Sequence, residues 1–372
     1  MSIDRRAIDA TIYNKKKPIL DVKMENGIIT NIKKIREAEF LPICLQKDTS
    51  IENANIWLSK RKIPKNREGL EEATLLFGNY LQFHNMFSLS DQYWIKYKKN
   101  ESWEKGNFFT NQYSNAVGRS FFMPWTLEKK EVRQQGPDLT TNGVLRKVWM
   151  QNDCLESFLV KAGSKKFHQD PISEILSSFM LRQLNIIPFV EYTIYIYGYR
   201  TCSRCKGFVT KDTEFIPFKQ LYDYQPRKEN ETPYDHILRA CDAFEITGAK
   251  EYIDKMILAD LVIGNKDRHL GNFGVIRNTN TAKIEGFSPL FDFGSAFWGA
   301  KDDENRKIKT LFKKIEKSVL EKNKNYIASK YPDNDELLFK FIDMYPEITI
   351  LEKKEIKKGI EKRRFLIMGE NK

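Results

Sequence analysis

Three oxygen-bearing side chains, in fixed order and at fixed spacing, constrain this chain more than any other feature of its sequence. Asp267 and Asn272 lie five residues apart within IGNKDRHLGNFG, residues 263–274. Asp292 follows twenty residues later within LFDFG, residues 290–294. Each motif alone is a weak signal, because Asp and Asn are common in turns. Together, each after a short apolar run, they favour one site built from two loops over the alternative of two unrelated Asx-rich hairpin turns.

This set of side chains fits the needs of phosphoryl transfer from ATP. One aspartate accepts or orients the hydroxyl of the substrate. An asparagine and a second aspartate hold Mg²⁺, a hard cation that prefers oxygen ligands and keeps several of its waters. Protein kinases use an Asp, an Asn five positions later and a downstream Asp-Phe-Gly for these roles. The spacing therefore predicts Asp267 as the catalytic aspartate, with Asn272 and Asp292 as ligands of Mg²⁺.

The upstream chain offers the remaining parts of an ATP site. Residues 158–161 form an apolar run that ends in Lys161, and Glu174 follows thirteen residues later in a helix opened by Pro171. In kinases such a lysine contacts the ATP phosphates and pairs with a helix glutamate. A loop with hydroxyls and a small residue, whose N–H groups could approach phosphates, precedes them: Thr140, Thr141, Asn142 and Gly143. Lysines and glutamates at such positions are also common for structural reasons, but their order ahead of Asp267 favours the ATP site.

Together these residues resemble the HipA-like serine/threonine kinases. This bacterial family has a protein-kinase-like fold that is related to the phosphoinositide 3/4-kinases. Asp267-Arg268-His269, then Asn272, then Asp292-Phe293-Gly294 is the order that this group shares. The motifs cover residues 136–300. The resemblance implies an α+β, two-lobed fold, with an antiparallel sheet in the N-terminal lobe and a mainly helical C-terminal lobe.

The resemblance also implies roles for the matching residues around ATP and Mg²⁺. Asp267 is then the catalytic base and His269 organises its loop. Lys161, held by Glu174, binds the ATP phosphates, while Asn272 and Asp292 bind the metal.

Three further assignments follow from the family's phosphate loop and hinge. A glycine followed four residues later by lysine fits Gly143 and Lys147. Thr140 stands three residues before that glycine, where HipA autophosphorylates a serine. The family's hinge follows its central β-run, so we expect Phe208 and Val209 to contact adenine.

Changes in composition and pattern divide the chain into three expected parts. Residues 1–135 are an aromatic-rich α/β portion, residues 136–210 the ATP-binding core of the N-lobe, and residues 211–372 a helical C-lobe with the catalytic and metal-binding loops. The charged run of residues 128–137 marks the first boundary. Strands are expected at residues 19–24, 144–150, 156–161 and 189–197. Helices are expected at residues 51–60, 68–83 and 172–184, and from residue 305 onward with a loop at 332–334.

Aromatic residues crowd the segment from Phe87 to Trp125. Aromatic side chains dominate core burial, so this block predicts the core of the N-terminal portion. The alternative is a surface on which a nucleic-acid reader stacks bases.

The formal net charge is +12, from 62 Lys and Arg against 50 Asp and Glu. The surplus is spread over mixed-sign segments. In the C-terminal run of residues 352–364, glutamates interleave with lysines and arginines, which indicates a solvated helix face rather than a nucleic-acid-binding arm. An acidic or nucleic-acid partner remains an alternative explanation of the charge.

The resemblance implies a protein substrate with a Ser or Thr acceptor. HipA itself works with a DNA-binding partner, so an antitoxin-like or DNA-binding partner and a toxin-like role are further expectations. Two other functions stay open. One is a lipid or small-molecule kinase of the same fold, and the other is a catalytically silent regulator that binds DNA or an antitoxin.

The sequence also bears on compartment and metal content. No run approaches the roughly 18 apolar residues of a membrane span, and the chain starts with polar residues, so we expect a cytoplasmic protein, with delivery to a host cell left open. Five cysteines in 372 residues do not form a disulfide scaffold. Cys202 and Cys205 have the spacing of a metal-binding pair, but a structural zinc needs four ligands and no second pair is present.

Overall fold

The computed structural model describes residues 7–81, 84–127, 135–164, 168–297, 312, 315–333 and 335–369. It divides into two compact units that share the chain in alternating segments. Unit 1 comprises residues 1–160, 207–216 and 275–285, and unit 2 comprises residues 161–206, 217–274 and 286–372. Most of the charged run of residues 128–137, expected to mark a boundary, lies outside the described residues.

Unit 1 begins with a four-stranded antiparallel sheet in the order β3-β2-β1-β4. Its strands are β1 (Ile8–Asn14), β2 (Lys17–Glu25), β3 (Ile28–Ile35) and β4 (Tyr93–Lys96). The Asn26-Gly27 turn joins β2 to β3 with both residues at positive φ, +49° and +73°, as a tight hairpin requires. The strand expected at residues 19–24 is confirmed within β2.

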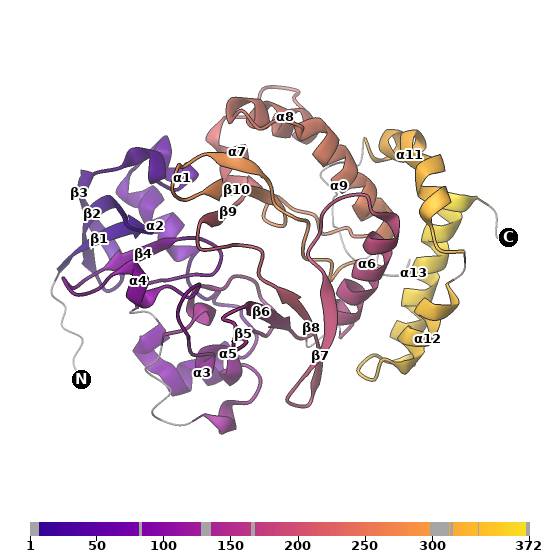
Figure 1. Cartoon of the computed structure of the whole chain (residues 1–372), viewed down its shortest axis with the longest axis horizontal. Helices are drawn as coiled ribbons and strands as arrows, with labels where there is room; N and C mark the ends of the chain where they lie inside the picture. Colours follow the sequence, from indigo (N-terminus) through magenta and orange to yellow (C-terminus); the bar gives the residue numbers. More distant parts are fainter. Residues whose placement is uncertain are drawn as a thin grey trace. The chain divides into compact units, whose positions relative to one another are not determined.

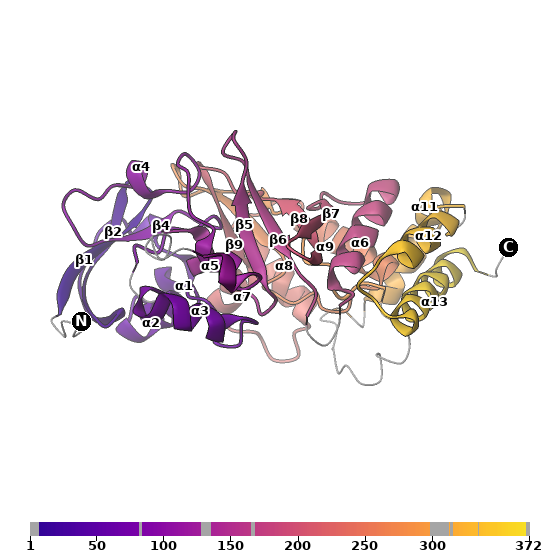
Figure 2. The same ribbon diagram turned by 90° about the horizontal axis from the view of Figure 1, so that it is seen from below.

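Helices cover one face of this sheet (Figure 2). They are α1 (Ile43–Gln46) and α2 (Ile51–Ser59). The Ser50 hydroxyl caps α2 by accepting the N–H of Asn53. Ile12 and Leu20 of the sheet and Trp57 of α2 are buried in one cluster, and burying a large apolar side chain contributes about 1.5–3 kcal/mol. The helix expected at residues 51–60 is confirmed.

The rest of unit 1 consists of short elements around an aromatic core. They are η1 (Ala38–Phe40), α3 (Leu70–Phe77), η2 (Gly78–Leu81), α4 (Trp103–Gly106), α5 (Ala116–Ser120), η3 (Pro124–Thr126) and η5 (Pro137–Thr140). Phe87, Trp94, Trp103 and Phe108 are buried together, which confirms that the aromatic block forms core. Trp125 is the exception, 68% exposed.

The described residues form two further sheets, and their strands position the motifs. In unit 1, β9 (Thr213–Pro217), β10 (Gly274–Asn278) and β11 (Ile284–Phe287) form a sheet in the order β11-β10-β9. The neighbouring strands β5 (Lys147–Gln151) and β6 (Ser157–Lys161) match the expected hairpin. β5 starts three residues later than predicted, because the Val144 carbonyl accepts the N–H of Glu68 and Arg146 donates to the Phe121 carbonyl.

Unit 2 is mainly helical. Its strands β7 (Tyr192–Tyr197) and β8 (Arg200–Lys206) pair antiparallel, and the sheet to which they belong has the order β5-β6-β8-β7. Its helices are α6 (Asp170–Leu184), α7 (Phe218–Tyr224), α8 (Pro233–Ala243), α9 (Ala249–Ile263), α11 (Glu316–Lys330), α12 (Glu336–Met344) and α13 (Ile350–Met368). The last three gather together and are yellow in Figure 1, and both α11 and α13 contact α9.

Several predictions for unit 2 are confirmed, with one difference. The helix expected at residues 172–184 is α6, and Pro171 lies in its first turn. The apolar run at residues 261–263 is the end of the 15-residue helix α9. On α13, the expected solvated face is not uniform, because Arg363 and Arg364 are half-buried rather than exposed.

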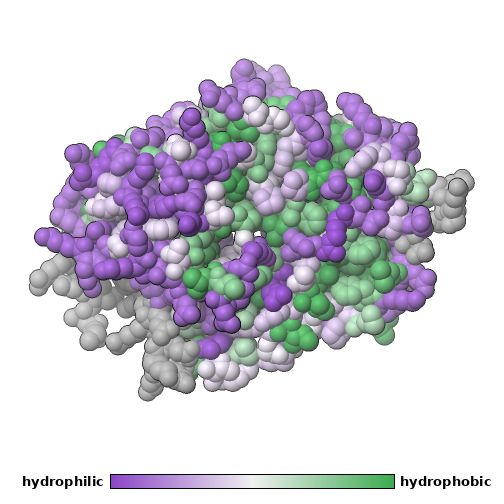
Figure 3. Space-filling model, viewed as in Figure 1, coloured by the Kyte–Doolittle hydropathy of each residue, from purple (hydrophilic) through white to green (hydrophobic). Residues whose placement is uncertain are grey.

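The surface of unit 2 carries an apolar area. Apolar side chains gather over β7 and α12 in the lower right of Figure 3. Among the exposed apolar residues of these elements are Ile196, which is 72% exposed, and Met344, which is 74% exposed.

Candidate active site

A buried lysine in unit 2 lies between two carboxylates that are far apart in sequence. The Lys161 ammonium, at the end of β6, forms an ion pair with Glu174 of α6 and lies 3.0 Å from Asp292 Oδ1. The Lys161 and Glu174 side chains are 8% and 2% exposed, whereas Asp292 is 42% exposed. Burial alone would lower the pKa of Lys161, but the carboxylates of Asp292 and Glu174 outweigh burial and raise it well above its usual value. Lys161 is therefore a fixed cation beside an accessible carboxylate.

Glu174 is oriented from its other side as well. Ser203 Oγ on β8 donates a hydrogen bond to Glu174 Oε2, so both carboxylate oxygens have partners. Because Ser203 and Cys205 are two residues apart on one strand, they share a face of β8. The buried hydroxyl thus fixes the carboxylate that fixes Lys161.

Asp292 has a backbone conformation that side-chain-bearing residues rarely adopt. Its φ is +64°, in the left-handed region that costs energy for a residue other than glycine. The Asp292 N–H donates to the Tyr192 hydroxyl at 3.1 Å. The Tyr192 ring also lies 5.2 Å from Lys161 Nζ and packs edge-on against Phe293. Tyr192 therefore contacts both members of the ion pair, Lys161 through its ring and Asp292 through its hydroxyl.

The loop that carries Asp267 begins where α9 ends. Gly264 adopts φ +66° at the C-terminus of α9, a conformation that favours glycine. Asn265 then donates from its backbone N–H to the Asp260 carbonyl and from its side chain to the Asp260 carboxylate. The chain leaves the helix in a fixed direction, which leaves Asp267 exposed.

Arg268 joins this loop to the segment of Asp292. Its guanidinium is buried and forms two parallel bonds of 2.9 Å with the Asp260 carboxylate. Its Nη1 donates to the carbonyl of Asn272 at 2.7 Å and to that of Phe291, the residue before Asp292, at 2.6 Å. One nitrogen thus holds Asn272 and Asp292 in neighbouring positions.

Asn272 and His269 complete the loop. The Asn272 side-chain N–H₂ donates to the Asp267 carbonyl at 3.2 Å, so the amide oxygen is the atom suited to a cation. His269 Nδ1 accepts the N–H of Gly271 at 3.0 Å, and its carbonyl accepts the N–H of Asn272. The His269 ring is exposed and shapes the turn through these bonds.

The donor set fits Mg²⁺ better than a metal that needs a full protein cage. The described residues contain no group of three or more His, Cys, Asp or Glu placed to hold a metal. Mg²⁺ binds through one or two protein oxygens and fills its shell with water and phosphate. Asn272 and Asp292 can supply such a pair of oxygens.

Comparisons with known proteins gave a partial sequence match and structural matches. No family model matches the chain. The chain is similar to the serine/threonine-protein kinase CtkA of Helicobacter pylori, with 32% identity over 105 residues. The match covers 27% of this chain and 32% of CtkA, so it spans about a third of that relative's length. A crystal structure of the H. pylori proinflammatory kinase CtkA aligns with 60% of this chain and 91% of its own, at 19% identity and a TM-score of 0.48.

A solved toxin–antitoxin complex gives a structural match that covers more of the chain than CtkA does. It contains HipA, HipB and operator DNA from Shewanella oneidensis MR-1. The alignment covers 97% of both chains, with a TM-score of 0.59 and 13% identity. The chain has the fold of the HipA-like kinases. The fold class implied by the resemblance is therefore confirmed.

Within this HipA-like fold, the predicted phosphate loop lies in unit 1. Thr140 is the last residue of η5, and Thr141 follows it. Gly143 adopts a φ of +93°. The buried Lys147 ammonium donates to the Asn142 carbonyl at 2.7 Å. The Thr140 hydroxyl is also buried and donates to the carbonyls of Phe87 and Pro137. A phosphoryl group on Thr140 would break both of these bonds.

The buried carboxylate of Asp138 helps to hold the same loop in place. Asp138 accepts the N–H of Trp149 on β5 at 2.9 Å, and the Trp149 indole donates to the Thr141 hydroxyl. Arg67, which is also buried, donates to the Thr141 carbonyl. Burial raises the pKa of Asp138 to about 7. The HipA-like fold thus encloses an acidic group two residues before Thr140.

The two predicted adenine-contacting residues also lie in unit 1. Phe208 and Val209 follow β8 in an irregular segment and are half-buried. The Phe208 ring packs edge-on against Phe215 of β9. Among the sequence-predicted residues, unit 2 brings together Lys161, Glu174 and Asp292, with Asp267, His269 and Asn272 on the adjoining loop.

The motifs did not reveal Tyr192, Ser203 or the Arg268–Asp260 pair. Arg268 lies between Asp267 and His269 in the sequence. This position inside the motif was the one sequence signal that could have pointed to its role. Ser203 and Tyr192 carry no motif, and only the pairing of β7 with β8 places them near Glu174 and Asp292.

The cysteine pair is part of the β-structure. Cys202 and Cys205 are three residues apart on β8, which puts them on opposite faces of the strand. Burial raises the pKa of both thiols to about 12. Metal binding and redox exchange need the thiolate, so neither thiol is prepared for such chemistry.

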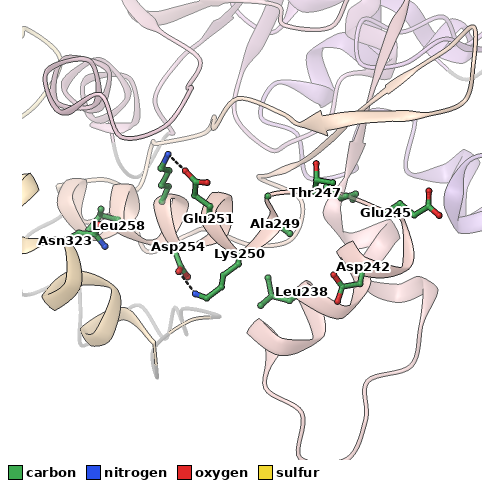
Figure 4. Close-up of a pocket in the computed structure, with 13 residues that line it drawn as sticks. Leu238, Asp242, Glu245, Thr247, Ala249, Lys250, Glu251, Asp254, Leu258 and Asn323 are labelled. Atoms are coloured by element: carbon green, nitrogen blue, oxygen red, sulfur yellow. Dashed lines mark hydrogen bonds and ion pairs between the residues drawn. The ribbon is translucent and has the colours of Figure 1, made fainter.

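A separate hollow lies away from the motif residues. A cavity of about 1040 Å³ sits at the start of α9, where Lys250 pairs with Asp254 and Lys255 with Glu251 (Figure 4). The predicted site residues are not part of its lining. Separately, no helix among the described residues is long and apolar enough to cross a membrane.

Proposed function

We propose that this chain is an ATP- and Mg²⁺-dependent serine/threonine protein kinase of the HipA-like type. The observation that carries the proposal is the buried Lys161 ammonium between Glu174 and Asp292. Through Arg268, Asp292 is joined to the loop of Asp267 and Asn272. This arrangement supplies the fixed cation, the oxygen ligands and the exposed base that phosphoryl transfer uses.

In this proposal each residue has a defined task. Lys161, oriented by Glu174, contacts the ATP phosphates. Asp267 accepts the proton of the substrate hydroxyl as that oxygen bonds to the γ-phosphorus. The bond from the γ-phosphorus to the bridging oxygen breaks, and ADP leaves. Mg²⁺, when held by oxygens of Asn272 and Asp292, would neutralise charge on the phosphates.

The residues of unit 1 complete the proposal. Thr141, Asn142 and Gly143 offer backbone N–H groups to phosphate, with Lys147 as a second cation. Phe208 and Val209 contact adenine. Thr140 is the proposed site of autophosphorylation, which its buried hydroxyl permits only when the loop opens.

The expected division of the chain and its compartment belong to the same proposal. We assign ATP binding to residues 136–210 and the catalytic and metal-binding loops to residues 211–372, with residues 1–135 as an added N-terminal portion. Five free cysteines, three of them buried, fit a reducing cytoplasm.

The test is transfer of labelled γ-phosphate from ATP to a mixture of protein acceptors in the presence of Mg²⁺. Asp267→Ala should lower the rate by a factor of about 10²–10⁴, because general-base catalysis contributes that much. Asp153→Ala, at an exposed hairpin turn, is the matched control and should transfer at the wild-type rate. Equal rates for wild type and Asp267→Ala would contradict the assignment.

The acceptor class needs its own experiment, since fold does not fix substrate. A screen that offers proteins, phosphoinositides and aminoglycosides should yield labelled Ser or Thr in protein. Label only in lipid or in a small molecule would replace the proposal with a kinase of the same fold and another acceptor.

We also propose an antitoxin-like or DNA-binding partner and a toxin-like role. The support is the HipA neighbour, which was solved with HipB and operator DNA, together with the net charge of +12. Retention of the purified chain on duplex DNA, measured at rising salt, tests direct contact. Absence of salt-dependent retention would leave a protein partner as the route to DNA.

A further inference from the structure

Phe297, five residues after Asp292, occupies a strained backbone position inside unit 2. It is 1% exposed and adopts φ +58°, a left-handed conformation that costs energy for a residue other than glycine. Its N–H donates to the carbonyl of Ile263 at 3.0 Å, and Ile263 is the last residue of α9. The segment that follows Asp292 is therefore bonded to the start of the loop that carries Asp267.

Two further bonds fix the turn between Asp292 and Phe297. The Ala296 N–H donates to the Phe293 carbonyl at 2.9 Å. The buried Ser173 hydroxyl of α6 donates to the Ala296 carbonyl, also at 2.9 Å. Phe293 is fully buried, and closely packed interiors transmit a displacement instead of absorbing it. A shift of Phe297 would therefore pass through this turn to the residue next to Asp292.

The C-terminal helix α13 reaches Phe297 through a glycine. Gly359 is buried near the middle of α13. A Cβ at this position would lie 2.5 Å from the Phe297 carbonyl oxygen and 3.0 Å from the carbonyl carbon. Real Cβ atoms essentially never come so close to another heavy atom, and these atoms are backbone rather than the end of a flexible side chain. Glycine is therefore the residue that lets α13 lie so near to Phe297.

Glycine is otherwise an unfavourable residue for this position. Inside a helix it is less favourable than every residue except proline, and alanine is the most favourable. Most of α13 consists of good helix formers, namely Leu, Glu, Lys, Arg and Met. The helix thus carries a poor helix former at the point where the backbone of Phe297 passes, which indicates a packing role for Gly359.

A second residue on the same face of α13 contacts the other loop. Arg363 follows Gly359 by four residues, so the two side-chain positions are neighbours on the helix surface. A Cβ at Gly264 would lie 2.6 Å from Arg363 Nε, and Gly264 is where the chain leaves α9 toward Asp267. One face of α13 therefore lies against both the loop of Asp267 and the segment of Asp292.

We propose that α13 sets the position of Asp292 and that Gly359 is the positioning residue through which it does so. A side chain at residue 359 would push the Phe297 carbonyl away, weaken the bond from Phe297 to Ile263 and shift the turn that leads back to Asp292. The Asp292 carboxylate would then no longer be held in its place beside Lys161. The inference rests on the proposed role of Asp292 as a ligand of Mg²⁺.

The first experiment needs no catalysis and compares glycine with alanine at two positions of α13. At Lys354, which is exposed, Lys354→Gly should melt about 1 °C or more below Lys354→Ala, because helix propensity decides there. At residue 359 the order should reverse, so Gly359→Ala should melt about 1 °C or more below the wild type. A Gly359→Ala protein that melts at or above the wild type would overturn the inference.

Hydrogen exchange then shows where the change occurs. The amides of residues 293–297 should exchange about fivefold faster or more in Gly359→Ala than in Lys354→Gly, which weakens the same helix away from Phe297. Equal exchange in these two variants would contradict the role of Gly359. If Gly359→Ala does not fold, the wild type decides. Its Phe297 amide should exchange as slowly as the amides in the middle of α13, and faster exchange would mean that α13 does not hold this residue.

The second experiment measures metal use in phosphate transfer from ATP, well below the melting temperatures. The Mg²⁺ concentration for half-maximal rate should rise about tenfold or more in Gly359→Ala, as when an outer partner of a metal ligand is lost. The rate at saturating Mg²⁺ should change much less, and Lys354→Gly should keep the wild-type Mg²⁺ dependence. A general loss of stability would not separate the two variants in this way.

The outcomes distinguish this inference from the proposed function. If the wild type transfers phosphate and Gly359→Ala has the same Mg²⁺ dependence, the positioning role fails and the kinase proposal stands. If the wild type transfers no phosphate under any condition, the kinase proposal fails and the link to metal use fails with it. In that case melting and hydrogen exchange still decide whether α13 holds the segment of Asp292.

Discussion

Asp292 depends on a residue that belongs to no motif. Its left-handed backbone, at φ +64°, is fixed by the bond from its N–H to the Tyr192 hydroxyl. The Tyr192 ring also faces Lys161. A phenol that holds the strained residue we propose as a metal ligand is a positioning residue, and its loss should affect metal use before it affects the fold.

Tyr192→Phe keeps the ring and removes the hydroxyl. We expect a loss of about 1 kcal/mol in stability and a rise in the Mg²⁺ concentration needed for half-maximal rate, because Asp292 loses its backbone support. Initial rates at varied Mg²⁺ provide the measurement. Tyr195→Phe, on the same strand, is the control and should leave the Mg²⁺ dependence unchanged. An unchanged dependence in Tyr192→Phe would show that the hydroxyl does not position Asp292.

Asp138 offers a test through pH. Burial raises its pKa to about 7 in the folded state, from an unfolded value of 3.8. A carboxyl group whose folded pKa is raised binds its proton more tightly when folded, so its contribution to stability is greatest below pH 4 and declines as pH rises toward 7.

Asp138→Asn should therefore flatten the pH dependence of unfolding between pH 4 and 7. The shift of about three pKa units corresponds to about 4 kcal/mol, which is the upper limit for the stability that the wild type loses through Asp138 between pH 4 and 7 and that Asp138→Asn does not lose. Urea unfolding of both proteins at several pH values gives the comparison. Parallel stability curves for the two proteins would mean that Asp138 does not titrate in this range.

At the scale of elements, sequence reasoning succeeded where local signals dominate. Pro171 marked the start of α6, and Asn26-Gly27 marked the β2–β3 turn. It failed where tertiary bonds decide, as at residues 144–146, which bond to Glu68 and Phe121 instead of joining β5. The mixed charges on α13 predicted a solvated helix face. Periodicity therefore did not predict that the Arg363 side chain is half-buried.

The end of α9 can be tested with a matched pair of glycines. Gly248 and Gly264 flank this helix at φ +69° and +66°, so alanine at either carries the same backbone strain, about 1 kcal/mol. A Cβ at Gly248 meets nothing within 4 Å, whereas at Gly264 it meets the Arg363 guanidinium. We expect Gly264→Ala to destabilise the protein by at least 1 kcal/mol more than Gly248→Ala in chemical unfolding. Equal losses would mean that Arg363 moves away without cost.

At the scale of the whole molecule, each of the two units is built from separate segments of the chain. The ion pair between Lys161 and Asp292 joins residues that lie 131 positions apart in the sequence. No local sequence pattern predicts a contact over such a separation. The resemblance to the HipA-like kinases placed both residues in one site before the structure did so. Tyr192 and Ser203 were not found this way, because they act through the geometry of paired strands rather than through a motif.

The most direct test of the kinase proposal is the mass of the products after incubation with ATP and Mg²⁺. Wild-type protein should add phosphate to itself or to an added protein acceptor, and tandem mass spectrometry should place it on Ser or Thr. Asp292→Ala and Asp267→Ala should add none in the same time, while Asp153→Ala should match the wild type. Equal phosphate addition by all four proteins, or none by the wild type, would contradict the proposed phosphotransfer site.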